Sequence, residues 1–224
     1  MCEPSVLLLA LQHGDSQAPG GGFAFSWGLE GLAADGRFHR TDLADFMEGQ
    51  LVHRWACFDR PIVARAHGYH GIEDVTRLDA TVDAWLPIEP QRTGSARAGN
   101  ALLGFHQRMG TPGARAFRTA IEEGQAVGHL PVVQGVVWQG IGASRTTALT
   151  LSAHCMVSGL AGAALRLGKV SHVDAQGAIA RLRPLISTLI EEPVPPIESL
   201  HAFTPLSDIA MLRSQERDVR LFSN

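Results

Sequence analysis

Charged side chains are scarce in this chain. Aspartate, glutamate, lysine and arginine make up 18% of its 224 residues, and the formal net charge is −3, whereas a charged fraction of about 25% is usual. The sequence has no basic excess or basic stripe that could neutralise phosphates, so its composition argues against nucleic-acid binding. Hydrophobic residues make up 45%. We expect one domain with a sizeable core, part of whose surface is covered by a partner protein.

Cysteines are few and unpaired in their spacing. The three of them, Cys2, Cys57 and Cys155, form no Cys-x-x-Cys motif, and a scattered odd set is typical of reduced thiols in a reducing compartment. The N-terminus has no basic region, and the apolar run at 6–11 is too short for a signal peptide or a membrane span. The expected location is therefore the cytoplasm, with no membrane association.

Sequence motifs for catalysis are also missing. The glycine run Gly20–Gly22 is followed by no Walker Lys-Ser or Lys-Thr, and its glycines are contiguous rather than spaced as in a dinucleotide-binding fingerprint. The segment from Ala24 to Gly28 is one glycine short of a nucleophile elbow. His154 and Cys155 are adjacent, so on a helix their side chains would point about 100° apart. No paired carboxylates or triad spacing stand out, and the sequence predicts a protein that is not an enzyme and binds no cofactor tightly.

What the sequence does have is a flexible joint that leads into bulky apolar residues. Three glycines are followed at once by Phe23, Phe25 and Trp27, and then by the helix-compatible Gly-Leu-Glu-Gly-Leu-Ala-Ala. Consecutive glycines cost too much backbone entropy to lie inside a helix or strand, and they allow positive φ angles and close approach of another segment. We interpret this stretch as the start of the core.

Most of the remaining chain has helical periodicity. Thr41 is a suitable N-cap for a long helix, whose apolar residues from Leu43 to Phe58 recur at steps of three and four, and Pro61 is expected to kink or break it. Together the patterns predict an all-α, single-domain bundle of about ten helices. The predicted helical ranges are 5–13, 27–34, 41–58, 62–70, 74–86, 94–109, 114–123, 131–142, 146–167, 173–191 and 204–221.

One of these helices is predicted against local propensity. The segment 131–142 is rich in valine, which favours strands. Its apolar pairs at 132/133 and 136/137 recur four residues apart, however, and no second strong strand candidate exists to pair with it. We therefore predict a buried helix.

The chain divides into three predicted regions. Residues 1–192 form the helical body, 193–203 a proline-rich linker, and 204–224 a tail helix that is expected to become ordered on binding a partner. The apolar residues of that helix, Leu206, Ile209 and Leu212, have two interpretations that are not exclusive: they contact a partner, or they dock on the chain's own body.

Ten histidines raise the question of a metal site. His67 and His70 have i,i+3 spacing, which on a helix would place both rings on one side. They are weak candidates, because a closed metal site needs two further ligands that the sequence does not indicate.

Five ordered blocks of the sequence resemble the UreF family of urease accessory proteins, nearly from end to end. The blocks are Pro19-Gly-Gly-Gly-Phe-Ala-Phe-Ser-Trp-Gly-Leu-Glu30; Arg92, Ser95 and Gly99-Asn-Ala-Leu-Leu103; His129-Leu-Pro-Val-Val-Gln-Gly-Val136; Arg166-Leu-Gly168 with Gln176; and Thr204-Pro-Leu-Ser-Asp-Ile-Ala210 with Arg213 and Arg220-Leu-Phe-Ser223.

The resemblance implies a non-enzymatic all-α scaffold that is needed for nickel insertion into apo-urease. Proteins of this family bind UreD (also called UreH), recruit the GTPase UreG, couple GTP hydrolysis to metal delivery and are usually homodimers. The nickel is then handled by the complex. The rival hypothesis is a stand-alone nickel carrier that uses His67, His70 and Cys57.

On this resemblance we expect the partner interface to include residues from both ends of the chain. They are Phe23, Phe25, Glu30, Arg166, Leu206, Ile209, Arg213 and Arg220.

Overall fold

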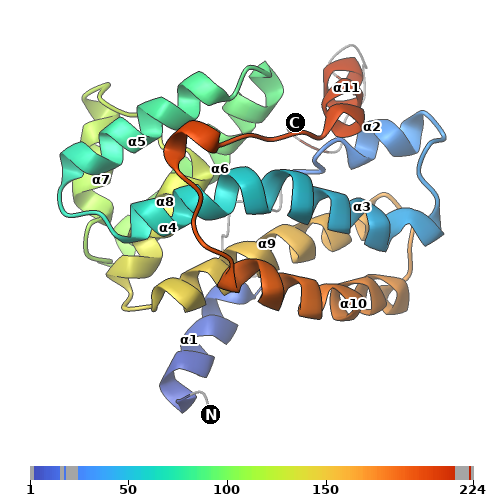
Figure 1. The fold of residues 1–224 in the computed structure, drawn as a ribbon, viewed down its shortest axis with the longest axis horizontal. Coiled ribbons are helices and arrows are strands. Elements are labelled where there is room, and N and C mark those ends of the chain that lie inside the picture. Colours follow the sequence, from blue (N-terminus) through green and yellow to red (C-terminus); the bar gives the residue numbers. More distant parts are fainter. Residues whose placement is uncertain (1–2, 16–17, 19–24, 215–221, 223–224) are drawn as a thin grey trace.

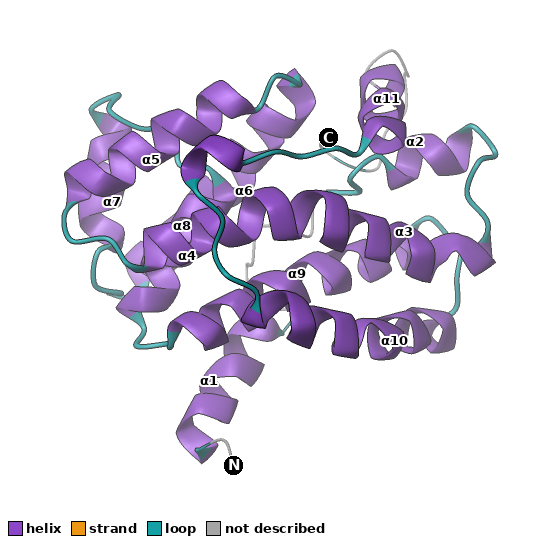
Figure 2. Cartoon of the chain, in the orientation of Figure 1, coloured by secondary structure: helices purple, strands orange, loops and turns teal. Residues whose placement is uncertain are grey.

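The described structure is a bundle of helices joined by loops and short turns (Figures 1 and 2). It is a computed structural model, and it describes residues 3–15, 18, 25–214 and 222. All regular secondary structure in these ranges is helical, which confirms the predicted all-α bundle. The α-helices are α1 (Pro4–Gly14), α2 (Leu29–Ala34), α3 (Leu43–Gln50), α4 (Arg60–His67), α5 (Ile72–Trp85), α6 (Glu89–Arg108), α7 (Ala114–Glu122), α8 (Leu130–Gly140), α9 (Arg145–Arg166), α10 (His172–Glu191) and α11 (Pro205–Ser214).

The long helix around Pro61 differs from the prediction in two ways. It starts with a 3-10 turn, η2 (Arg40–Asp42), whose N-cap is His39 and not Thr41. The His39 backbone N–H donates a hydrogen bond to the Asp42 carboxylate at 2.8 Å. Pro61 does not break it either. A π-helix, η3 (Leu51–Asp59), joins α3 directly to α4, and the proline lies in the first turn of α4. The carbonyl of Cys57, four residues before the proline, instead accepts a hydrogen bond from the His201 N–H at 3.4 Å.

Helix α8 is the segment whose valines favour a strand but whose apolar residues have helical spacing. The predicted helix is confirmed. All residues from Pro131 to Trp138 are buried. Its main neighbours are the helices α4 and α6, so tertiary packing on several sides outweighs the weak preference of valine for strands. At Gly135 an added Cβ would lie 2.7 Å from the Val63 carbonyl oxygen and 2.8 Å from the His67 nitrogen, so the glycine allows α4 and α8 to pack backbone to backbone.

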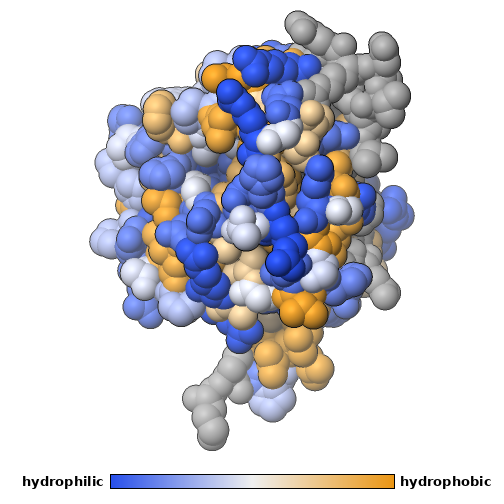
Figure 3. All heavy atoms as spheres, turned by 90° about the vertical axis from the view of Figure 1, so that its right-hand side faces the viewer, coloured by the Kyte–Doolittle hydropathy of each residue, from blue (hydrophilic) through white to orange (hydrophobic). Residues whose placement is uncertain are grey.

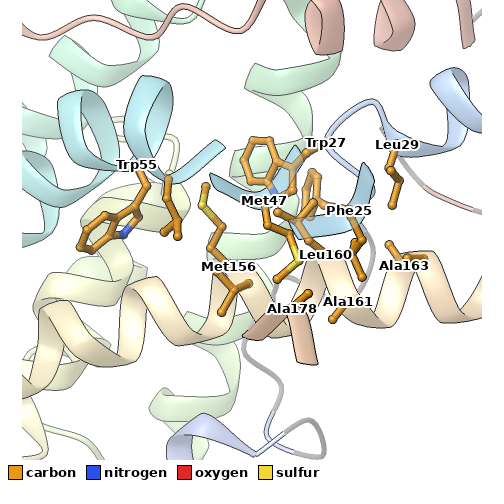
Figure 4. Close-up of a cluster of buried hydrophobic side chains, with 14 of the residues drawn as sticks. Phe25, Trp27, Leu29, Met47, Trp55, Met156, Leu160, Ala161, Ala163 and Ala178 are labelled. Atoms are coloured by element: carbon orange, nitrogen blue, oxygen red, sulfur yellow. The ribbon is translucent and has the colours of Figure 1, made fainter. Parts of the chain in front are cut away.

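The core consists of two hydrophobic clusters, and α9 contributes to both. The first cluster contains the aromatic residues Phe25 and Trp27, which lie among side chains of α3, η3, α9 and α10 (Figure 4). The second cluster is built mainly from α4, α5, α6 and α8. By length and composition alone, α9 could cross a membrane, but 61% of its most apolar stretch is buried inside the protein, as in a core helix.

The segment between α10 and α11 lies across the outside of η3 and α4. Arg60 donates hydrogen bonds to the carbonyls of Glu192, at 2.7 Å, and Pro193, at 3.1 Å. Further along, the N–H of Phe203 donates to the His53 carbonyl at 2.9 Å. A short 3-10 turn, η4 (Ile197–Ser199), lies between these contacts. The segment therefore delivers α11 to a defined place beside α2, as the ribbon shows (Figure 1).

Candidate protein-interaction surface

Helix α11 has one face packed on the body and one exposed to solvent. We call Ser207, Ala210, Met211 and Ser214 its inner face, and all four are buried. We call Leu206, Ile209 and Leu212 its outer face, and these side chains are 51%, 48% and 47% exposed. Phe203, just before the helix, is also exposed. Docking on the chain's own body, one of the two interpretations of the three apolar residues, therefore covers only about half of each side chain.

The inner face approaches α2 closely because two glycines leave room for it. A Cβ added at Gly28 would lie 2.5 Å from the Ser207 carbonyl oxygen, and one at Gly31 would lie 2.5 Å from that of Ala210. Gly28 also has φ 82°, a left-handed conformation that favours glycine. The two glycines of the Gly-Leu-Glu-Gly stretch thus form the surface on which α11 packs.

The outer face lies at the end of the molecule where α2 and α11 meet. Figure 3 shows hydrophobic surface interrupting the hydrophilic surface at the top of the molecule, the level at which α11 lies in Figure 1. At the rim of this region Arg213 pairs with Asp35 of the turn after α2, at 3.8 Å. Grouped exposed apolar side chains with a polar rim are typical of a protein-interaction surface.

Beneath α11 lies a chain of buried polar groups that the sequence analysis did not identify. Arg54 of η3 is 1% exposed and donates a hydrogen bond to Gln91 Oε1 of α6 at 3.2 Å. Gln91 Nε2 in turn donates to Asp208 Oδ1 of α11 at 2.5 Å. We call these three residues the Arg54 relay. Arginine has only hydrogen-bond donors, and an ionised carboxylate has only acceptors. A glutamine side chain has both, so it can accept from the arginine and donate to the carboxylate.

The π-helix explains the charge partner of Arg54. Its Nε lies 3.3 Å from Asp59 Oδ2, although residues five apart in an α-helix point about 140° away from each other. In a π-helix the i→i+5 hydrogen bonds place such residues one turn apart on the same face. Burial raises the pKa of the Asp59 carboxyl, and the charge of Arg54 opposes this shift.

Arg54 also holds the aromatic segment that precedes α2. Its guanidinium carbon is 4.2 Å from the centre of the Trp27 ring, a cation–π contact. Trp27 stacks in turn on Phe25, with ring centres 5.6 Å apart, and has a φ of 52°. Positive φ is strained for a tryptophan, so these contacts stabilise a conformation that the backbone alone disfavours.

The other predicted interface residues have varied positions. Phe25 lies in the core rather than on the surface, because its ring fills the space beside Gly94 of α6. Glu30 is half-buried on α2. Arg166, at the end of α9, places its guanidinium carbon 4.3 Å from the ring centre of the buried Phe222. Phe23 and Arg220 lie outside the described residues.

His67 and His70, the weak metal-ligand candidates, do not lie together on one helix. Helix α4 ends at His67, whose Nε2 lies 2.8 Å from the Ala143 carbonyl oxygen, whereas His70 lies beyond the helix end. Cys57 contacts the Val52 carbonyl within η3. Across residues 3–15, 25–214 and the isolated described positions, no three histidine, cysteine, aspartate or glutamate side chains are grouped so that they could hold a metal ion.

Comparison with known proteins assigns the chain to a family. The model of the UreF family matches residues 39–183. The urease accessory protein UreF of Trichodesmium erythraeum is 29% identical, over 98% of this chain and 97% of its own length. The proteins of that name from Yersinia pseudotuberculosis serotype IB and Actinobacillus pleuropneumoniae serotype 5b are 27% and 26% identical, over 98% and 93% of this chain and 99% and 94% of their own lengths. The chain therefore belongs to the UreF family of urease accessory proteins.

Proposed function

We propose that this chain is a non-enzymatic scaffold for urease maturation in the cytoplasm. In this role it binds UreD/UreH, recruits the GTPase UreG and joins apo-urease as a homodimer, so that GTP hydrolysis is coupled to nickel insertion. Nickel is cargo of the whole assembly and not a resident cofactor of this chain. Family membership supports the general role in urease maturation.

The observation that carries the scaffold proposal is the outer face of α11. Three large apolar side chains, each about half exposed, are presented by a helix whose other face is fixed to the body. Burying a leucine or isoleucine side chain stabilises a complex by about 1.5–3 kcal/mol before the costs of association. A preformed apolar stripe of this kind suits a protein partner and offers no catalytic groups.

The experiment is co-purification of the chain with its cognate UreD and UreG after substitution of the outer face. The double variant Leu206→Glu with Ile209→Glu is expected to fold normally, because about half of each side chain is exposed and a longer carboxylate can reach solvent from there. Capture of UreD, and of UreG through the complex, should fall at least about tenfold, since each buried carboxylate would have to be desolvated at the interface.

Val173→Glu is the matched control. Val173 is an apolar residue of α10 that is 82% exposed and far in sequence from α11, so the control adds the same carboxylate at a solvated helix position and should leave capture unchanged. Unchanged capture by the double variant, with circular dichroism like that of the wild type, would overturn the role of the outer face.

A further inference from the structure

The tail helix of the candidate surface and the buried segment 25–28 both depend on one buried cation. The tail helix α11 reaches Arg54 through Gln91 and Asp208, and the segment 25–28 reaches it through the Trp27 ring. The segments also touch directly, because Gly28 lies against Ser207. In η3, Arg54 is fixed in turn by Asp59.

We propose that Arg54 is a positioning residue that holds both α11 and the buried segment 25–28, so that removing its guanidinium loosens both the partner-facing helix and the segment against which it packs. That α11 faces a partner protein rests on the proposed function. The structural coupling itself concerns this chain alone.

The geometry leaves Arg54 no simple substitute. One planar guanidinium pairs with Asp59 and donates to Gln91 while it also lies over the Trp27 ring. A lysine ammonium is a compact point charge that cannot make both directional contacts and stack as well. Without Arg54, Gln91 loses the donor that orients its amide toward Asp208, and Trp27 loses a stabilising contact at a strained φ.

Several polar contacts hold the tail helix on the body. Gln50 Nε2 donates to Ser207 Oγ at 2.7 Å, and Thr204 Oγ1 donates to Asp208 Oδ1 at 3.1 Å, in addition to the Arg54 relay. Only Ala210 and Met211 bring buried apolar side chains from α11 itself. Because buried polar bonds are lost at full cost when one partner is removed, a single change in the relay should loosen the helix measurably.

The first test is amide hydrogen exchange of the full-length chain with Arg54→Lys. Exchange should rise about tenfold or more both in 25–28 and in 204–214. Arg60→Lys is the matched control, because Arg60 is an equally buried arginine of the same helical run that bonds to carbonyls of the linker. The control should leave exchange in 25–28 unchanged. A rise in only one of the two segments, or in neither, would overturn the coupling.

The second test changes the polarity of the relay while keeping its shape. Gln91→Glu places a carboxylate against Asp208, so exchange in 204–214 should rise about tenfold, whereas 25–28 stays protected because the introduced carboxylate still accepts from Arg54. Adding Asp208→Asn supplies a donor and should restore the wild-type rate in 204–214 to within about twofold. Failure of this rescue would show that the relay does not hold α11. Because neither test contains a partner, a failure of the proposed function would leave their outcome intact.

Discussion

At the scale of single residues, the structure contains a histidine that is kept neutral by its surroundings. His106 of α6 is fully buried, its Nδ1 lies 2.9 Å from Thr111 Oγ1, and its ring stacks on that of His13 from α1, with ring centres 5.2 Å apart. Burial, followed by repulsion from His13, lowers the pKa of His106 from 6.5 to about 4. The folded state therefore takes up this proton later than the unfolded state as the pH falls.

This difference predicts a loss of stability in mild acid. Above pH 6.5 the imidazole is neutral in both states, and between about pH 6.5 and 4 only the unfolded chain is protonated at this position, so the free energy of unfolding should fall by about 2–3 kcal/mol over that window. Urea unfolding at pH 7 and pH 4.5 measures it. His106→Gln removes the titrating group, and the variant should lose correspondingly less between the two pH values. An equal loss in both proteins would rule out His106 as the source.

At the scale of elements, two glycines inside helices have opposite roles. Gly135 of α8 is in contact with the backbone of α4, whereas Gly162 of α9 has no atom within 4 Å of an added Cβ. Helix propensity favours alanine over glycine equally at both positions, by about 1 kcal/mol. Only the packing differs between them.

The two alanine substitutions should therefore shift stability in opposite directions. Gly162→Ala should raise the free energy of unfolding by about 0.5–1 kcal/mol. Gly135→Ala should lower it by about 1–3 kcal/mol, because α4 and α8 must separate to admit a methyl group. Thermal and urea unfolding of both variants measure the difference. A Gly135→Ala protein as stable as the wild type would mean that α4 and α8 are not in backbone contact.

At the scale of the whole molecule, the two terminal helices contribute unequally. Helix α1 has no fully buried residue and extends away from the body (Figure 1), whereas α11 buries four residues beside α2 and Phe222 lies in the first hydrophobic cluster. The outward leucines of α1, at 7, 8 and 11, are exposed. The two ends of the chain thus differ in how far the core depends on them.

Deletion of residues 204–224 should therefore cost more stability than deletion of residues 1–14. Loss of the tail removes Met211, Ala210 and Phe222 from the core, and we expect a decrease of at least about 3 kcal/mol in the free energy of unfolding. Urea unfolding of the two truncated chains compares them directly. The opposite order would contradict the assignment of the tail to the core. It also follows that point substitutions on the outer face test partner binding more cleanly than truncation does.

The sequence allowed the helices to be predicted well, but not the polar interior. Periodicity identified α8 correctly although its valines favour strands, because spacing reports burial more directly than propensity does. It could not determine which face of α11 is exposed, since Leu206 and Ile209 alternate with small residues that pack equally well. The burial of Arg54 could have been predicted, because it follows Leu51 by three residues and so lies on the apolar face of the helix. Its pairing with Asp59 could not have been predicted, because α-helical spacing separates the two side chains.

The π-helix makes the number of residues in this stretch matter as much as their identity. A chain shortened by one residue between Gln50 and Arg60 could still form an unbroken helix, now of ordinary pitch. If the lost residue lies outside 54–59, Arg54 and Asp59 remain five residues apart, and side chains five apart in an α-helix point about 140° away from each other. Their ion pair would then be lost even though both residues were kept. In genetic terms, loss of one codon here should be more harmful than most missense changes, including removal of the exposed His53 side chain alone.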